Sequence, residues 1–170
     1  LSPKEEAVIF AVWHVLALSM RMAINSKMQI PMAEEFLGTL LSSLETIAKY
    51  SPRILCNVLL VLDMYIIYYE KVADVRPEDS NLSTVNSAKS GVLKDRRSLM
   101  KRLIDIVPSC VHNADTYNAI LLVIVRLSAE SGIFRDIPIA DFFKAVFDSN
   151  TIGLFPRQID LVTLIIRRIV

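Results

Sequence analysis

Apolar residues recur every three or four positions along most of the chain, which is the period of an α-helix and not of a β-strand. Glycine, which weakens helices, occurs at only 4 of the 170 positions. Most prolines stand where a helix would begin or end, because proline lacks the amide proton that a helix interior needs. The sequence therefore predicts an all-α protein of about seven helices.

Capping residues followed by proline predict where the helices begin. Ser2, Pro3 and Glu5 supply an N-cap, a proline in the first turn and a capping-box acid, and Ser51 with Pro52 repeats this arrangement. Later prolines, asparagine and glycine give the remaining boundaries, including an end of the fourth helix just before a proline. We expect helices over residues 3–26, 31–49, 52–72, 92–107, 113–131, 138–148 and 156–170.

Residues 74–91 differ in composition from the rest of the chain. Asp, Pro, Ser, Asn, Thr and Gly dominate there, and few side chains are available for burial. The segment is therefore predicted to be a polar loop insert.

The predicted helices alternate as pairs. Residues 30–36 (IPMAEEF) resemble residues 137–143 (IPIADFF), and in both cases a later helix begins with Pro-Arg. The longer helices begin near residues 2, 51, 113 and 155, at spacings of 49, 62 and 42 residues, and the middle spacing falls to about 45 without the insert. We therefore expect residues 1–170 to form a single α-solenoid of about three and a half antiparallel hairpins, or a fragment of a longer one.

Two segments carry a resemblance to a known family: LSPKEEAVIFAVWHVLAL and SPRILCNVLLVLDMY. They resemble the first helix of the organellar octotricopeptide and heptatricopeptide repeats, whose pattern is approximately Ser-Pro-x-x-Leu-Ala-Asn-x-Leu-Trp-Ala-Leu-Ala. The best matches are Ser51, Pro52, Leu55, Asn57 and Leu59, whereas Leu60 replaces the expected tryptophan. The resemblance implies an RNA-facing surface just inside the helix starts, where Arg53 and Arg157 lie, and a mitochondrial location.

No arrangement of residues typical of an enzyme is present. His14 lies within an apolar helix and His112 in a capping loop, and neither has a partner at metal-ligand spacing. Cys56 and Cys110 stand alone in apolar stretches, which favours two buried thiols over a zinc site or a disulfide framework. We therefore expect a protein that is not an enzyme and uses no metal or cofactor.

Positive charge is concentrated in one predicted helix. The net charge is only +1, so the chain lacks the overall basicity of many nucleic-acid-binding proteins. Five cations lie within nine residues, with only Asp95 opposing them: Lys94, Arg96, Arg97, Lys101 and Arg102. These side chains either bind phosphates or form an ordinary solvated helix face, and the sequence leaves both interpretations open.

Apolar residues make up 53% of the chain and charged residues 22%, which is more apolar surface than a small domain normally buries. Other protein subunits are therefore expected partners. The longest uncharged run, residues 7–20, has fourteen residues, whereas a membrane-spanning helix needs about 18 or more. We expect no integral membrane insertion.

These features lead to a primary functional hypothesis and two alternatives. The primary hypothesis is a non-catalytic RNA-binding or scaffolding subunit of an organellar ribonucleoprotein complex, most simply a mitochondrial one and otherwise intracellular. The first alternative is an armadillo- or HEAT-like scaffold that binds proteins without touching RNA. The second is a closed helical bundle belonging to a membrane-associated complex.

Overall fold

The computed structural model describes residues 2–28, 33–72, 96–130, 132–148 and 156–170, and these residues contain helices and turns without a β-strand. The all-α prediction is confirmed. The helices are α1 (Pro3–Asn25), α2 (Ala33–Tyr50), α3 (Pro52–Val72), α5 (Arg96–Cys110), α6 (Ala114–Leu127), α7 (Ala140–Val146), the short 3₁₀ helix η2 (Pro156–Gln158) and α8 (Ile159–Ile169).

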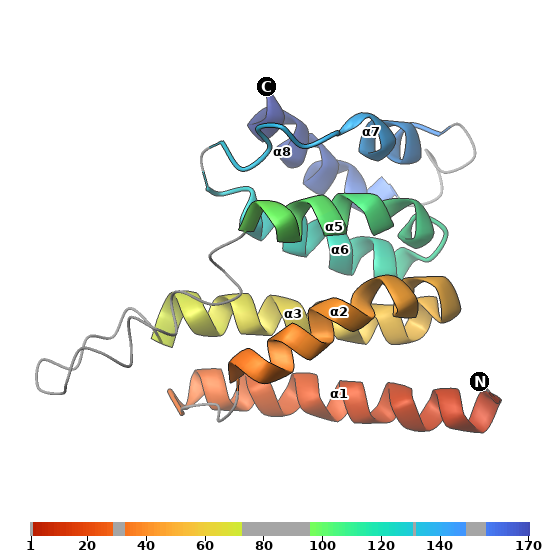
Figure 1. Cartoon of the computed structure of the whole chain (residues 1–170), viewed down its shortest axis with the longest axis vertical. Helices are drawn as coiled ribbons and strands as arrows, with labels where there is room; N and C mark the ends of the chain where they lie inside the picture. The colour runs from red at the N-terminus through yellow and green to blue at the C-terminus, as the bar shows by residue number, and fades with distance from the viewer. Residues whose placement is uncertain (1, 29–32, 73–95, 131, 149–155) are drawn as a thin grey trace, which may run out of the picture.

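The helices lie in two columns (Figure 1). In one column α1 contacts α3, α3 contacts α6, and α6 contacts α8; in the other, α2 contacts α5, and α5 contacts α7. The columns are joined because α2 packs on α3 and α5 packs on α6. The first column consists of the helices that begin at the four predicted hairpin starts. A solenoid also requires that the layers are copies of one repeat, and this stays a prediction.

Side-chain caps explain where several helices begin. The Ser2 amide donates to Glu5 Oε2 at 2.7 Å and the Glu5 amide to Ser2 Oγ at 3.3 Å, so the predicted capping box is present. The Ile54 amide donates to Ser51 Oγ at 3.3 Å at the start of α3. Asn113 Oδ1 accepts from the Thr116 amide at 3.0 Å and caps α6.

The core runs continuously through the layers. Its largest fully buried side chains come from α2, α3, α5, α6 and α7: Leu40, Leu44, Leu55, Leu59, Leu62, Ile66, Met100, Leu103, Ile104, Ile120 and Phe142. Polar links join neighbouring layers as well. Asp63 on α3 accepts from Arg126 on α6 at 2.5 and 3.1 Å, and Thr116 Oγ1 donates to the Pro52 carbonyl at 2.7 Å.

Several predicted boundaries were wrong by a few residues. The helix predicted to end before Pro108 continues through it to Cys110, because burial of Val107 and Cys110 in the core offsets the hydrogen bond that the proline removes. The helix predicted to continue to residue 131 ends at Leu127, where Ser128 Oγ bonds the Val125 carbonyl and a turn follows. The predicted loop over residues 74–91 lies outside the described residues.

Candidate functional site

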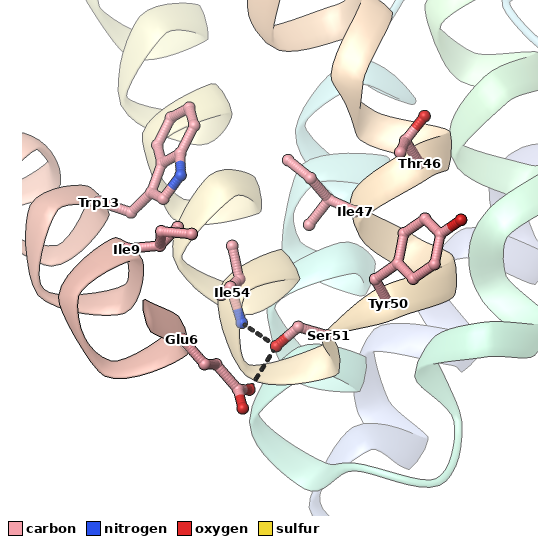
Figure 2. Close-up of a pocket in the computed structure, with 8 residues that line it drawn as sticks. All are labelled: Glu6, Ile9, Trp13, Thr46, Ile47, Tyr50, Ser51 and Ile54. Atoms are coloured by element: carbon pink, nitrogen blue, oxygen red, sulfur yellow. Dashed lines mark hydrogen bonds between the residues drawn. The ribbon is translucent and has the colours of Figure 1, made fainter. Parts of the chain in front are cut away.

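An apolar groove lies between α1 and α2 (Figure 2). It opens because α2 crosses α3 obliquely and does not lie along α1 (Figure 1). Side chains from α1 and α2 face each other across it, and Ile54 of α3 lies between them. The groove encloses about 440 Å³ and is lined by Glu6, Ile9, Trp13, Thr46, Ile47, Tyr50, Ser51 and Ile54.

One end of this groove is acidic. The Ser51 hydroxyl donates to Glu6 Oε1 at 2.6 Å while its oxygen accepts from the Ile54 amide, so one side chain both caps α3 and positions the carboxylate. A carboxylate has two oxygens and several acceptor sites, so Glu6 can still accept from a bound cation. None of the lining residues is basic. The groove therefore suits an apolar ligand that carries a positive charge at one end.

The groove was missed at the level of sequence, although part of its lining shows in the residue spacing. Glu6, Ile9 and Trp13 are three and four residues apart, which places them along one face of α1. Ser51, which completes the acidic end, lies 45 residues from Glu6, and only the tertiary fold brings the two together.

A second groove, of about 460 Å³, lies where α1, α3 and α6 meet. The Arg53 guanidinium lies 5.1 Å from the centre of the Phe10 ring, and the Phe10 and His14 rings are nearly parallel at 6.1 Å. Asn57 Nδ2 donates to the Phe10 carbonyl at 3.1 Å. The lining residues are Phe10, His14, Arg53, Cys56, Asn57, Leu60, Asn113, Asp115, Asn118 and Ala119. Arg53 is thus the predicted RNA-binding residue that lies beside aromatic rings.

The cations predicted to form one patch on α5 have different environments. Arg96 lies 3.5 Å from a Glu130 carboxylate oxygen, and Arg102 donates to the Leu41 carbonyl at 3.3 Å. Arg97 and Lys101 are exposed one turn apart. Lys94 lies outside the described residues.

The two remaining predicted RNA-binding residues do not join the α5 cations. Arg53 is on α3, in the groove beside Phe10, and Arg157 is exposed on η2, which packs against α6 and α8. The six predicted cations within the described residues are therefore distributed over α3, α5 and η2, and the structure does not gather these six at one site.

The two cysteines have different environments: Cys110 is buried in the core as predicted, whereas Cys56 is half-buried and lines the second groove, so the prediction of a buried thiol is confirmed for Cys110 only. Burial, with a smaller effect from Asp115, raises the pKa of Cys56 to about 11. Burial, with a smaller effect from Cys56, raises the pKa of Cys110 to about 12. Both thiols are therefore protonated at neutral pH, which makes them poor nucleophiles and poor metal ligands. Across the described parts of the chain, no group of three or more His, Cys, Asp or Glu side chains could hold a metal ion.

The outer face of α1, opposite α3, is apolar. Its large side chains are between 49% and 70% exposed: Val8, Val12, Val15, Leu18 and Met22.

Among the described helices, α1 is also the one long and apolar enough to cross a membrane, a property that core helices and signal sequences share. The apolar helix continues past Arg21 to Asn25, so it is longer than the fourteen-residue uncharged run. The absence of membrane insertion stays a prediction.

Comparison with protein-family models, with curated proteins and with solved structures finds no match for this chain. The resemblance to organellar helical repeats therefore stays a prediction that depends on its own motif residues. The mitochondrial location that it implies also stays a prediction.

Proposed function

We propose that the protein is a non-catalytic helical scaffold that binds a segment of a partner protein in the groove between α1 and α2. The observation that carries this proposal is the groove itself, an apolar cleft of about 440 Å³ with one carboxylate at its end. A cleft of this size that is mostly apolar and contains a few placed polar groups is typical of ligand-binding sites. The excess of apolar residues in the sequence agrees with such a role.

The lining of the groove defines the chemistry of the partner segment. Ile9, Trp13 and Ile47 offer apolar contacts, and Glu6 offers a charged acceptor at one end. An amphipathic helix places apolar side chains at spacings of three and four residues, which lets several of them enter one groove. The expected ligand is a short amphipathic helix with a lysine or arginine next to its apolar face.

A displayed library of amphipathic peptides tests this proposal on the full chain. Enriched peptides should share an apolar stripe and one terminal cation. Trp13 is the only tryptophan in the chain, so its fluorescence reports binding directly. Binding should weaken at least tenfold for Ile47→Glu, because a charge would then lie in the apolar part of the groove.

Two further variants test the role of the Glu6 charge and provide a control. Glu6→Gln keeps an acceptor for the Ser51 hydroxyl and removes the charge, so it should lose the preference for a cation and keep the preference for apolar residues. Leu122→Glu changes an exposed apolar residue on α6 and should leave binding unchanged. Peptides that bind equally well to the parent chain and to Ile47→Glu would contradict the proposal.

RNA binding, as part of a ribonucleoprotein complex, is a second candidate function favoured by one observation. Arg53, Phe10 and His14 form a cation and aromatic cluster in the second groove, and stacking on aromatic and guanidinium groups is how single-stranded bases are often held. Each phosphate contact should add about 0.7 to the slope of log affinity against log salt. Affinity for a random single-stranded RNA that does not fall with Arg53→Glu would exclude this site.

A further inference from the structure

We infer that the outer face of α1 binds the same face of a second copy of this chain, with the two helices antiparallel. This surface is separate from the groove of the proposed function, because Ile9 and Trp13 line the groove from the opposite side of α1. Two observations carry the inference: the composition of the end layers and the spacing of the exposed side chains.

The two ends of the first column differ in what they expose. At one end, α8 exposes four polar or charged residues, Asp160, Thr163, Arg167 and Arg168, together with one large apolar side chain, Ile159. At the other end, α1 has apolar residues on its outer face as well as on the face toward α3. A contiguous exposed apolar surface of this kind is typical of interaction sites. The outer face of α1 therefore has the composition of an interface.

The exposed apolar side chains are spaced symmetrically about Val15. Val12 and Leu18 lie three residues away on either side, and Val8 and Met22 lie seven residues away. A two-fold axis through Val15 would therefore place Val8 opposite Met22, Val12 opposite Leu18, and Val15 opposite itself. This is the property that an interface between identical surfaces requires, because each contact must occur twice.

Small residues occupy symmetric positions in the same face. Ala11 and Ser19 lie four residues on either side of Val15, and both are exposed. The Ser19 hydroxyl donates to the Val15 carbonyl at 2.8 Å, so this polar group is already hydrogen-bonded within the helix. Small side chains allow two helix backbones to approach closely, and a satisfied hydroxyl can be buried at little cost.

The helix dipoles favour the antiparallel orientation, because it places the partly positive N-terminus of each α1 beside the partly negative C-terminus of the other. The first turn carries Lys4 as well as Glu5, and Glu6 faces the groove, so side chains in this turn add little to the choice of orientation. At the other end, Arg21 lies near the end of the helix and Lys27 follows it, and a parallel pair would bring these cations of the two copies together.

The contacts of α1 with α3 favour a protein partner over a lipid bilayer. The Ser51 hydroxyl bonds Glu6 at 2.6 Å and the Asn57 amide bonds the Phe10 carbonyl at 3.1 Å, so polar contacts as well as apolar ones hold α1 in the stack. Insertion of α1 across a membrane would break these contacts. One helix from each protomer gives an interface near the lower limit for specific complexes, about 1,000 Å² in total. The dimer should therefore dissociate on dilution.

Sedimentation of the purified chain from low micromolar to near-millimolar concentration tests for the dimer. The parent chain should move from monomer to dimer over this range. Val15→Glu, which places two carboxylates at the two-fold axis, should remain monomeric with an unchanged circular dichroism spectrum, because Val15 is already largely exposed. Leu122→Glu should dimerise like the parent chain. A parent chain that is monomeric throughout, or a dimer that survives Val15→Glu, would overturn the inference.

Cysteine crosslinking tests the register and the orientation. Val15→Cys should form a disulfide with itself under mild oxidation, and Val8→Cys should link to Met22→Cys in a mixture but not to itself. The parent chain, which contains Cys56 and Cys110, reports the background. Efficient self-linking of Val8→Cys would mean a parallel pair and would overturn the inference. Flotation of a monomeric chain with phospholipid vesicles, abolished by Val15→Glu, would overturn it in favour of a membrane surface.

Discussion

Burial raises the pKa of the two cysteine thiols, and this shift predicts how the free energy of unfolding changes with pH. Cys110 is fully buried and its pKa is raised from 9.0 to about 12, because the core favours the neutral thiol over the thiolate. The folded state therefore holds this proton more tightly than the unfolded state does. The resulting stabilisation is complete below pH 9 and is lost as the pH rises from 9 towards 12.

Urea unfolding at pH 8 and pH 11 checks this linkage. Between these two values, the free energy of unfolding of the parent chain should fall by about 2.5 kcal/mol more than that of Cys110→Ala, which lacks this thiol proton. Cys56 and Tyr117, whose pKa values burial raises to about 11 and about 12, are present in both proteins, so their contributions nearly cancel in the comparison. An identical fall in the two proteins would show that the Cys110 thiol does not titrate in this range.

At the scale of single helices, the contribution of a capping residue to the free energy of unfolding grows with the number of groups to which it hydrogen-bonds. Asn113 bonds the first turn of α6, and Asn113→Ala should cost about 1 kcal/mol. Ser51 bonds both the first turn of α3 and the Glu6 carboxylate of α1, so Ser51→Ala should cost about 2 kcal/mol. Urea unfolding measures both values. Equal costs for the two variants would mean that the link between Ser51 and Glu6 contributes nothing to stability.

The helix boundaries could be predicted from sequence where a cap determines them. Ser2, Glu5 and Ser51 act through residues three positions away, and such local contacts can be read directly from the sequence. The end of α6 has a local contact, from Ser128 Oγ to the Val125 carbonyl, and a distant one, because Arg168, 40 residues away, donates to both of these groups. Contacts with distant residues can be predicted only with the tertiary structure.

The candidate sites were less predictable than the helices for the same reason. Arg53 was predicted as a binding residue, but its neighbour Phe10 comes from another helix and could not be paired with it from sequence. Arg96 and Arg102 were counted as available cations, whereas contacts with Glu130 and the Leu41 carbonyl engage them. The spacing of residues along one helix predicts a charged face, but it does not predict which groups of other elements contact that face.

At the scale of the whole molecule, the helices of the first column lie in a row, in which α1 contacts α3, α3 contacts α6, and α6 contacts α8. Each helix of the first column is covered on the faces where it meets its neighbours, and α1 has a neighbour in this column only on the side of α3 (Figure 1). Both proposed binding surfaces lie on α1: the groove residues on one side and the exposed apolar side chains on the other. A closed bundle would bury the outer face of α1 against the other helices and would leave no such surface.

Distances between spin labels on α1, α6 and α8 test most directly whether the helices of the first column lie in a row. Labels at exposed positions Ser19, Leu122 and Thr163, in protein diluted with unlabelled chain, can be measured in pairs by electron paramagnetic resonance. The row predicts that the distance from α1 to α8 clearly exceeds the distance from α1 to α6. A distance from α1 to α8 that is equal or shorter, as helices around one shared centre would give, would contradict the account.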